Sequence, residues 1–236
     1  MAAAGSGQRL GAGGPKAFVP VAGRPMVEWS IAAFRAAGSV GSIIVACPPG
    51  HAHNLDQSDI VVVDGGETRA HSVANALAAV ETDLVAIHDA ARPLVTPELI
   101  EALAARLAGA PDAAGVIAAT AITDTVKQVP GEASLSTTSA PLSISGMKKG
   151  ALVVESTMDR GRLWGAQTPQ VFRSDVLRAA LAGDAEPVAA ATDEAMLVEA
   201  AGGSVLIHPT EGENFKVTTP LDLRVAELLL SERALA

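Results

Sequence analysis

Short apolar runs alternate along the chain with longer segments of helical periodicity. The apolar runs, rich in valine and isoleucine, are residues 42–47, 59–64, 83–89, 114–120 and 204–209. The helical segments, whose apolar residues recur three and four positions apart, are residues 25–38, 68–80 and 97–109. Strands that are apolar at successive positions are typically buried on both faces. The pattern therefore predicts an α/β fold, an open, mostly parallel, twisted sheet with helices on both faces.

Proline, threonine and glycine mark the ends of the predicted helices. Pro25 and Pro97 suit the first helical turn, where a missing N–H has no cost. Thr96 suits an N-cap, because its hydroxyl can accept a hydrogen bond from a free backbone N–H. Gly38 and Gly109 stand where the periodic pattern stops, and we expect them to terminate their helices.

Residues 131–150 differ in composition from the rest of the chain. The segment GEASLSTTSAPLSISGMKKG is rich in Ser, Thr and Gly and carries no sustained period. This is typical of an exposed loop or an extended arm, and a disordered surface insertion fits the same composition. We predict a single domain over residues 1–236 that carries an arm or insertion at about 128–158.

Composition and charge exclude several classes of function. The 236 residues are 49% apolar, enough for a packed core, but no stretch approaches the roughly 20 apolar residues of a membrane-spanning helix. The start lacks the order of a signal peptide. The formal net charge of −9 would repel a polyphosphate backbone, and 3% aromatic residues offer few surfaces for stacking bases. We predict a cytoplasmic protein that binds neither nucleic acid nor membranes.

The single cysteine and the histidines indicate no catalytic or zinc-binding cluster. Cys47 lies in the apolar run SIIVACP and has no second cysteine for an internal disulfide, which agrees with a reducing compartment and a place in the core. The five histidines show neither zinc-ligand spacing nor a credible catalytic triad.

The opening stretch AAAGSGQRLGAGGPK, residues 2–16, holds five glycines, one arginine and one lysine. Glycine lets backbone amides approach a ligand closely, and the two cations indicate that the ligand is an anion. In an open α/β sheet, a glycine-rich turn beyond the carboxyl ends of the strands presents N–H groups to phosphate. A flexible glycine-rich terminus is the alternative for this stretch taken alone.

Spacing separates this loop from two known phosphate loops. GSGQRLG has one residue more than the dinucleotide fingerprint, which also has no need of Arg9. A P-loop needs Gly-Lys-Ser/Thr, whereas Lys16 follows Pro15 and precedes Ala17. What remains is a backbone loop around a triphosphate that Arg9 and Lys16 neutralise. Those charges suit attack at phosphorus, because they stabilise the pentacovalent state and the departing pyrophosphate.

Seven segments in order carry a resemblance that spans nearly the whole chain. They are AAGSGQRLGAGGPK (3–16), VDGGETRAHSV (63–73), HDAARPLV (88–95), DTVK (124–127), DRGRLWGAQTPQ (159–170), TDEAMLVE (192–199) and NFKVTTPLDL (214–223). They resemble the 2-C-methyl-D-erythritol 4-phosphate cytidylyltransferase family. The resemblance implies a Rossmann-like nucleotidyltransferase fold, CTP and a polyol phosphate as substrates, release of pyrophosphate, and Mg²⁺ or another divalent cation held largely by phosphate oxygens.

The resemblance also implies which residues hold the nucleotide. Those expected along the nucleotide are Ala3, Ala4, Gly5, Ser6 and Gly7, with Arg9 and Lys16 stabilising the transition state. Cytosine selection maps to Gly66, Glu67 and Ser72, where many family members have aspartate in place of Glu67. Asp89, Ala90 and Arg92 are expected near the ribose and phosphates, with Asp89 as a metal ligand. The alternatives are a Gly-Gly turn before a helix and an Asp–Arg pair that ends a strand.

The second substrate also carries a phosphate and needs cations of its own. By resemblance, Arg160 and Lys216 position methylerythritol phosphate for attack, and Thr125, Thr168 and Thr192 lie near the same place. The role of Lys127 is less clear. A phosphate monoester is largely dianionic near neutral pH, so its oxygen needs no general base.

Two further expectations concern assembly and the start of the chain. The family forms homodimers in which an arm crosses to the partner, so Thr125 and Arg160 are expected to serve the neighbouring site. The family has a short central strand directly before the opening loop, where this chain has only Met1. Without that strand we expect unpaired neighbouring strands, a poorly anchored loop, and additional residues in the native product.

Three rival functions stay open. The chain could transfer cytidylyl to another polyol phosphate, such as ribitol 5-phosphate, or nucleotidyl to a sugar 1-phosphate. It could also be a nucleotide-binding module that has lost catalysis and binds CTP without releasing pyrophosphate.

Overall fold

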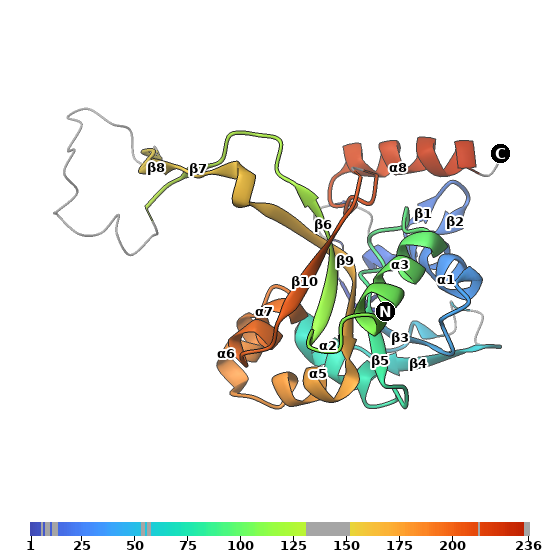
Figure 1. Cartoon of the computed structure of the whole chain (residues 1–236). Helices are drawn as coiled ribbons and strands as arrows, with labels where there is room; N and C mark the ends of the chain where they lie inside the picture. The colour runs from blue at the N-terminus through green and yellow to red at the C-terminus, as the bar shows by residue number, and fades with distance from the viewer. Residues whose placement is uncertain are drawn as a thin grey trace. The chain divides into compact units, whose positions relative to one another are not determined.

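The computed structural model describes residues 1–5, 7, 10, 14–52, 55, 58–130, 152–211 and 213–233. The chain divides into two compact units (Figure 1). The main unit comprises Met1–Ala119 and Ala166–Ala236, and the arm unit comprises Thr120–Gly165. The predicted arm at about 128–158 falls inside the arm unit, whereas a single domain over the whole chain stays a prediction.

Strands and helices alternate through the main unit. Its described helices are α1 (Met26–Ala36), α2 (Arg69–Leu77), α3 (Pro97–Ala108), α5 (Ser174–Leu181), α6 (Ala185–Ala190), α7 (Glu194–Ala200), α8 (Pro220–Arg233) and the 3-10 turn η2 (Lys16–Phe18). Its described strands are β1 (Pro20–Val21), β2 (Arg24–Pro25), β3 (Ile43–Cys47), β4 (Ile60–Asp64), β5 (Leu84–Ile87), β6 (Gly115–Ala121), β9 (Trp164–Arg173) and β10 (Val205–Pro209). Strands β6 and β9 continue into the arm unit, which also holds β7 (Lys127–Gln128), β8 (Ser156–Thr157) and η4 (Arg160–Arg162).

The described strands that carry the core form two sheets joined by Ala2. One sheet has the order β10-β6-β9-β5, and the other pairs β3 with β4. β3 runs parallel to β4 and β6 parallel to β10, but β9 runs antiparallel to β5. Ala2 makes isolated parallel bridges to Ala46, which lies in β3, and to Asp89, which follows β5. The predicted open α/β arrangement is confirmed, and β9 interrupts its parallel order.

The five apolar runs predicted as strands correspond to β3, β4, β5, β6 and β10, but the pattern missed β9. Its buried stretch includes Gln167, Thr168 and Gln170, which are all less than a tenth exposed. Buried polar residues break the apolar run by which a central strand is recognised. They remain buried because they are hydrogen-bonded, Asn214 to Gln167 and Gln170 to Asp193 among them.

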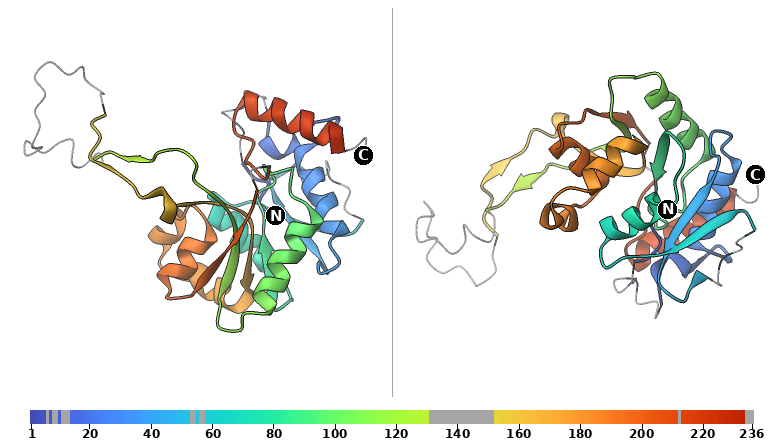
Figure 2. Two further views of the ribbon diagram at one scale, coloured as in Figure 1. Left: turned by 45° about the horizontal axis from the view of Figure 1, so that its top comes forward. Right: turned by 90° about the horizontal axis from the view of Figure 1, so that it is seen from below.

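Helices cover both faces of the sheets in the main unit, as the apolar pattern predicted (Figures 1 and 2). Ile44 and Ala46 pack with the cluster that includes α2, α5 and α7, whereas Ile43, Val45 and Cys47 pack with the cluster that includes α1. Alternate residues of β3 thus enter different cores, so the strand is apolar throughout. Cys47 is buried there, as expected for a core residue.

The predicted ends of α3 are confirmed. Thr96 is its N-cap and accepts a hydrogen bond from the N–H of Leu99 at 3.3 Å, and Gly109 is its C-cap. Pro25 is the N-cap residue of α1, and α1 ends at Ala36, two residues before Gly38. Among the described helices, none has both the length and the apolar character needed to cross a membrane.

Residues 1–3 anchor the opening loop between β3 and β5. The N–H of Ala2 donates to the carbonyl of His88 at 2.8 Å, and the N–H of Ala3 donates to the carbonyl of Ala46 at 2.8 Å. The N–H of Ala90 donates in turn to the carbonyl of Ala2 at 3.1 Å. The expectation that this loop would be poorly anchored is therefore wrong for its described first residues, because three residues suffice to bond both neighbouring segments.

Beyond Ala2, the facing edges of β3 and β5 border a narrow slot. A cavity of about 200 Å³ lies there, with Ile44 on one side and Ala86 on the other. Among the described strands, none other than β4 pairs with β3 and none other than β9 pairs with β5. The expectation of unpaired neighbouring strands is met in this slot.

Candidate functional site

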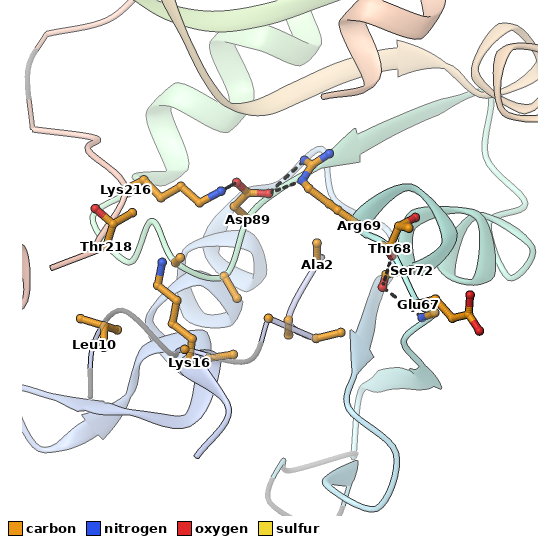
Figure 3. A pocket seen from close by; sticks show the side chains of 18 residues that line it. Ala2, Leu10, Lys16, Glu67, Thr68, Arg69, Ser72, Asp89, Lys216 and Thr218 are labelled. Atoms are coloured by element: carbon orange, nitrogen blue, oxygen red, sulfur yellow. Dashed lines mark hydrogen bonds and ion pairs between the residues drawn. The ribbon is translucent and has the colours of Figure 1, made fainter. Parts of the chain in front are cut away.

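A pocket of about 660 Å³ lies between the opening loop, the turn from β4 to α2, and the segment that follows β5 (Figure 3). All residues that line it belong to the main unit. Eleven of the lining residues are predicted as site residues from the sequence: Ala3, Ala4, Gly5, Gly7, Lys16, Gly66, Glu67, Ser72, Asp89, Ala90 and Lys216. The other seven lining residues are not predicted from the sequence: Ala2, Leu10, Ala17, Thr68, Arg69, Ala91 and Thr218. Ser6 and Arg9 lie outside the described residues.

The opening loop closes on itself at the edge of the pocket. The N–H of Lys16 donates to the carbonyl of Gly5 at 3.0 Å, which brings the end of the loop back to its start. Gly7 has φ +70°, and a Cβ at Gly7 would lie 3.0 Å from the carbonyl oxygen of Gly14. Glycine is required at this position, because both the left-handed backbone and the close approach exclude a side chain.

The turn between β4 and α2 packs directly on the opening loop. A Cβ at Gly65 would lie 2.4 Å from the Cβ of Ala4, so glycine permits the contact. The N–H of Gly66 donates to the hydroxyl of Ser72 at 3.1 Å, and that hydroxyl donates to the carbonyl of Thr68 at 3.0 Å. The turn therefore presents the N-terminus of α2 to the pocket, where a helix favours negative charge.

Four side chains of alternating charge run through the pocket wall. Asp89 accepts from Arg69 at 2.9 Å through Oδ1 and from Lys216 at 2.6 Å through Oδ2. Arg69 also donates through Nη1 to Oε1 of Glu194 at 2.5 Å. Figure 3 shows Arg69, Asp89 and Lys216 in this order along one side of the pocket, while Lys16 reaches the same pocket from the opening loop.

Burial and neighbouring charge set the pKa values in this chain of ion pairs. Burial alone would raise the pKa of Asp89, but Arg69 and Lys216 outweigh it and hold that pKa well below its usual range. Burial would lower the pKa of Arg69, but Asp89 and Glu194 raise it instead. The pocket wall therefore keeps a carboxylate and a guanidinium charged near neutral pH.

A buried hydrogen-bond chain fixes the backbone at Asp89. The N–H of Asp89 donates to the hydroxyl of Thr168 at 3.0 Å, and that hydroxyl lies 3.1 Å from Nδ1 of His88. In a neutral His88 ring the Thr168 hydroxyl either donates to Nδ1 or accepts from it, because its oxygen has two lone pairs, and Nε2 lies 3.3 Å from the hydroxyl of Ser30. Burial lowers the pKa of His88 to about 3, which agrees with the neutral form.

Arg92 holds the segment that carries Lys216. Arg92 is 8% exposed, and its guanidinium donates to the carbonyls of Asn214 at 2.7 Å and Ala166 at 3.4 Å. The N–H of Val217 donates to the carbonyl of Ala91 at 2.8 Å, next to Lys216. Arg92 and Thr168 are absent from the pocket lining, so the structure places them behind the pocket rather than in contact with its contents.

The other residues expected at the second substrate are not among those that line the pocket. Thr192 is exposed, in the turn before α7. Thr125 and Arg160 belong to the arm unit, within which the guanidinium of Arg160 donates to the carbonyl of Thr123. Lys127, also in the arm unit, donates to the hydroxyl of Thr157 at 2.7 Å. Their roles stay predictions.

Asp89 is the pocket carboxylate best suited to a divalent cation, although it is already paired. Among the described residues, no group of three or more His, Cys, Asp or Glu side chains could enclose a metal ion. Magnesium is commonly held by one or two carboxylates together with substrate phosphates, which fits a single aspartate. Both oxygens of Asp89 already accept from cations, so a metal ion would compete with Arg69 and Lys216 for them.

Arg69 and Glu194 were missed as site residues. Both lie within segments that carry the resemblance, Arg69 in VDGGETRAHSV and Glu194 in TDEAMLVE. They are 125 residues apart, and no periodicity or spacing pairs them. The proximity of Arg69 to Ser72 on a segment assigned to the nucleotide was the one available signal.

Comparison with known proteins agrees with this geometry. Residues 1–232 match the family model described as 2-C-methyl-D-erythritol 4-phosphate cytidylyltransferase. Two proteins of that name, from Frankia casuarinae and Nocardia farcinica, are each 42% identical to the chain. The matches cover 97% of this chain and 79% of the Frankia protein, and 98% of this chain and 93% of the Nocardia protein.

A solved structure supports the same assignment. The crystal structure of the cytidylyltransferase of that name from Thermus thermophilus is 33% identical and superposes with a TM-score of 0.73, covering 92% of this chain and 94% of that one. Sequence and structure thus agree over nearly the whole length. The chain belongs to the 2-C-methyl-D-erythritol 4-phosphate cytidylyltransferase family.

Proposed function

We propose that the protein transfers CMP from CTP to 2-C-methyl-D-erythritol 4-phosphate, forming 4-diphosphocytidyl-2-C-methyl-D-erythritol and releasing pyrophosphate. The observation that carries the proposal is the single pocket in which the opening loop, the N-terminus of α2, Lys16 and Lys216 meet. Two phosphorylated substrates repel each other, and this pocket gathers backbone N–H groups and cations from four separate segments. Family membership gives the identity of the substrates.

The nucleotide occupies the side of the pocket formed by the opening loop and the β4–α2 turn. Lys16 and, as a prediction from the sequence, Arg9 neutralise the triphosphate. Gly66, Glu67 and Ser72 select cytosine at the turn. The hydroxyl of Ser72 already holds the turn together through Gly66 and Thr68, so it supports this selection by fixing the backbone that faces the base.

The reaction is an in-line displacement at the α-phosphorus of CTP. An oxygen of the phosphate monoester forms a new bond to the α-phosphorus, and the bond from this phosphorus to the bridging oxygen of the β-phosphate breaks. Pyrophosphate departs with the electron pair of that bond. The monoester oxygen is already deprotonated near neutral pH, so the residues of the site position and stabilise charge rather than move a proton.

Lys216 and Arg160 position the second substrate. Lys216 reaches the pocket beside Asp89, and Arg160, Thr125 and Thr192 are predicted to contact the polyol phosphate. Thr168 and Arg92 contribute indirectly in this proposal, because Thr168 bonds Asp89 and Arg92 bonds the Asn214 carbonyl.

A divalent cation, Mg²⁺ or a substitute, completes the site in this proposal. Asp89 would be its protein ligand and the triphosphate would supply further oxygens. When bound, the cation supplies positive charge to the phosphate oxygens. Homodimerisation through the arm unit and a cytoplasmic location stay predictions.

The proposal is tested by pyrophosphate release from the purified protein. CTP with methylerythritol phosphate should give turnover, and ATP, GTP or UTP in place of CTP should give little. Faster turnover with ribitol 5-phosphate would favour the rival cytidylyltransferase. CTP binding by calorimetry without pyrophosphate release from any acceptor would favour the binding module and contradict the proposed reaction.

A further inference from the structure

We propose that Glu194 is a positioning residue that allows Asp89 to exchange Arg69 for a divalent cation. Glu194 holds Arg69 in the pocket wall while Asp89 changes partners. This inference rests on the proposed binding of CTP with a divalent cation, and it adds a function to a residue outside the pocket lining.

The geometry gives Arg69 two carboxylate partners on opposite sides. Its Nε and Nη2 lie 2.9 Å from Oδ1 of Asp89, and its Nη1 lies 2.5 Å from Oε1 of Glu194. Arg69 starts α2, Asp89 follows β5, and Glu194 starts α7. Three elements distant in sequence therefore meet at one guanidinium, whose rigid fork suits bidentate contacts of this kind.

Glu194 is placed to retain Arg69 rather than to bind substrate. It is 1% exposed and does not line the pocket. Its second carboxylate oxygen is buried without a hydrogen-bond partner among the described residues. A fully buried carboxylate is costly unless it is paired, so its contact with Arg69 is its main compensation.

The exchange at Asp89 requires such a retaining partner. If Asp89 were the sole counter-ion of Arg69, a cation that took its place on Asp89 would leave a guanidinium whose side chain is only 24% exposed without a carboxylate, which is unfavourable. With Glu194 present, Arg69 keeps one charge-assisted contact when Asp89 turns to the cation. Lys216, the other partner of Asp89, is more exposed and reaches the pocket, where substrate phosphate can replace the aspartate.

The experiment compares CTP affinity with and without Mg²⁺ by calorimetry, in the wild-type protein and in Glu194→Gln. The ratio of the two dissociation constants measures how much the metal ion strengthens CTP binding. In Glu194→Gln this ratio should fall about tenfold, the size expected when one charge-assisted hydrogen bond is lost. Affinity for CTP without metal should stay unchanged or rise, because the variant removes one negative charge near the site.

Two further variants separate this role from a structural one. Glu199→Gln changes an exposed glutamate on the same helix and should leave the ratio unchanged. If Glu194→Gln does not fold, Arg69→Lys serves instead, because a lysine keeps the charge but cannot bridge two carboxylates with a fork. It should lower the ratio in the same way.

The outcomes distinguish the inference from the proposed function. An unchanged ratio in Glu194→Gln, or an equal loss of affinity with and without Mg²⁺, overturns the role of Glu194. A wild-type protein whose CTP affinity does not respond to Mg²⁺ overturns it as well. A wild-type protein that binds no CTP under either condition contradicts the proposed function itself.

Discussion

His88 is a buried histidine whose ordinary role would be to change charge near neutral pH, yet its surroundings prevent this. Nδ1 lies 3.1 Å from the Thr168 hydroxyl, which accepts from the N–H of Asp89. Burial disfavours the charged form of the ring. One neutral ring therefore holds the backbone from which the Asp89 side chain extends.

This arrangement predicts an acid-sensitive contribution to stability from His88. Its pKa is about 3 in the folded protein against 6.5 when exposed, so between these values the unfolded state binds the proton and the native state does not. The contribution is complete above about pH 6.5 and declines as the pH falls. Between pH 7 and pH 5 the wild type should lose about 2 kcal/mol of unfolding free energy through His88.

Denaturant unfolding at pH 7 and pH 5 measures this loss. His88→Asn keeps an acceptor that does not titrate and should show a smaller difference between the two pH values. His71→Asn, at an exposed position, should keep the wild-type difference. Equal pH dependence in the wild type and His88→Asn would contradict the assignment.

Lys16 is predicted to act on the transition state more than on the bound substrate. It is the last residue of the opening loop and reaches the pocket in which the triphosphate is proposed to lie. Lys16→Ala should lower kcat about a hundredfold, as the loss of a group that stabilises developing charge does, and change the Kd for CTP only a few-fold. Steady-state kinetics and calorimetry check the two parts, with the exposed Arg106→Ala as control. An equal loss in both would make Lys16 a ground-state contact only.

At the scale of elements, the N–H groups of successive residues in β3 and β5 point alternately toward the slot between these strands and toward the neighbouring strand on the other side. The carbonyl of Ile44 and the N–H of Ala46 bond Met1, so even-numbered residues of β3 face the slot and odd-numbered residues face β4. On β5, Ser174 bonds the carbonyl of Asp83, which assigns odd-numbered residues to β9. Ile44 and Ala86 thus direct their N–H groups toward the slot.

The rate of amide hydrogen exchange should alternate in the same way between successive residues of β3 and β5. We expect the amides of Ile44 and Ala86 to exchange at least about tenfold faster than those of Val45 and Val85, because opening a strand-to-strand hydrogen bond is required only for the latter. Residue-resolved exchange measured by NMR checks the prediction. Equal protection of neighbouring amides along β3 and β5 would show that the slot edges are paired.

At the scale of the whole molecule, the pocket and the predicted arm belong to different units. The pocket lining lies wholly in the main unit, whereas the arm unit carries Arg160 and Thr125. The arm unit also exposes Leu152 and Val154, which are 68% and 53% accessible. Exposed apolar side chains close together in an extended segment are typical of an interaction surface.

The double variant Leu152→Asp, Val154→Asp is predicted to be monomeric where the wild type is dimeric. Two buried carboxylates without partners would oppose an arm-mediated interface. CTP binding should persist, because the pocket belongs to the main unit, and turnover should fall. Sedimentation velocity checks the assembly, with Met196→Asp, an exposed residue on α7, as control. A monomeric wild type would contradict the predicted homodimer.

The sequence by itself determined the α/β alternation, and its resemblance to the family indicated most of the residues that line the pocket. The alternation depends on apolar periodicity, a local feature that a linear pattern records. Only the tertiary structure decided that β9 is a buried polar strand, that Arg92 and Thr168 do not line the pocket, and that Arg69 joins Asp89 to Glu194. Hydrogen bonds between residues more than 100 positions apart, such as Arg69 to Glu194 and Lys216 to Asp89, exist only because packing brings their elements together.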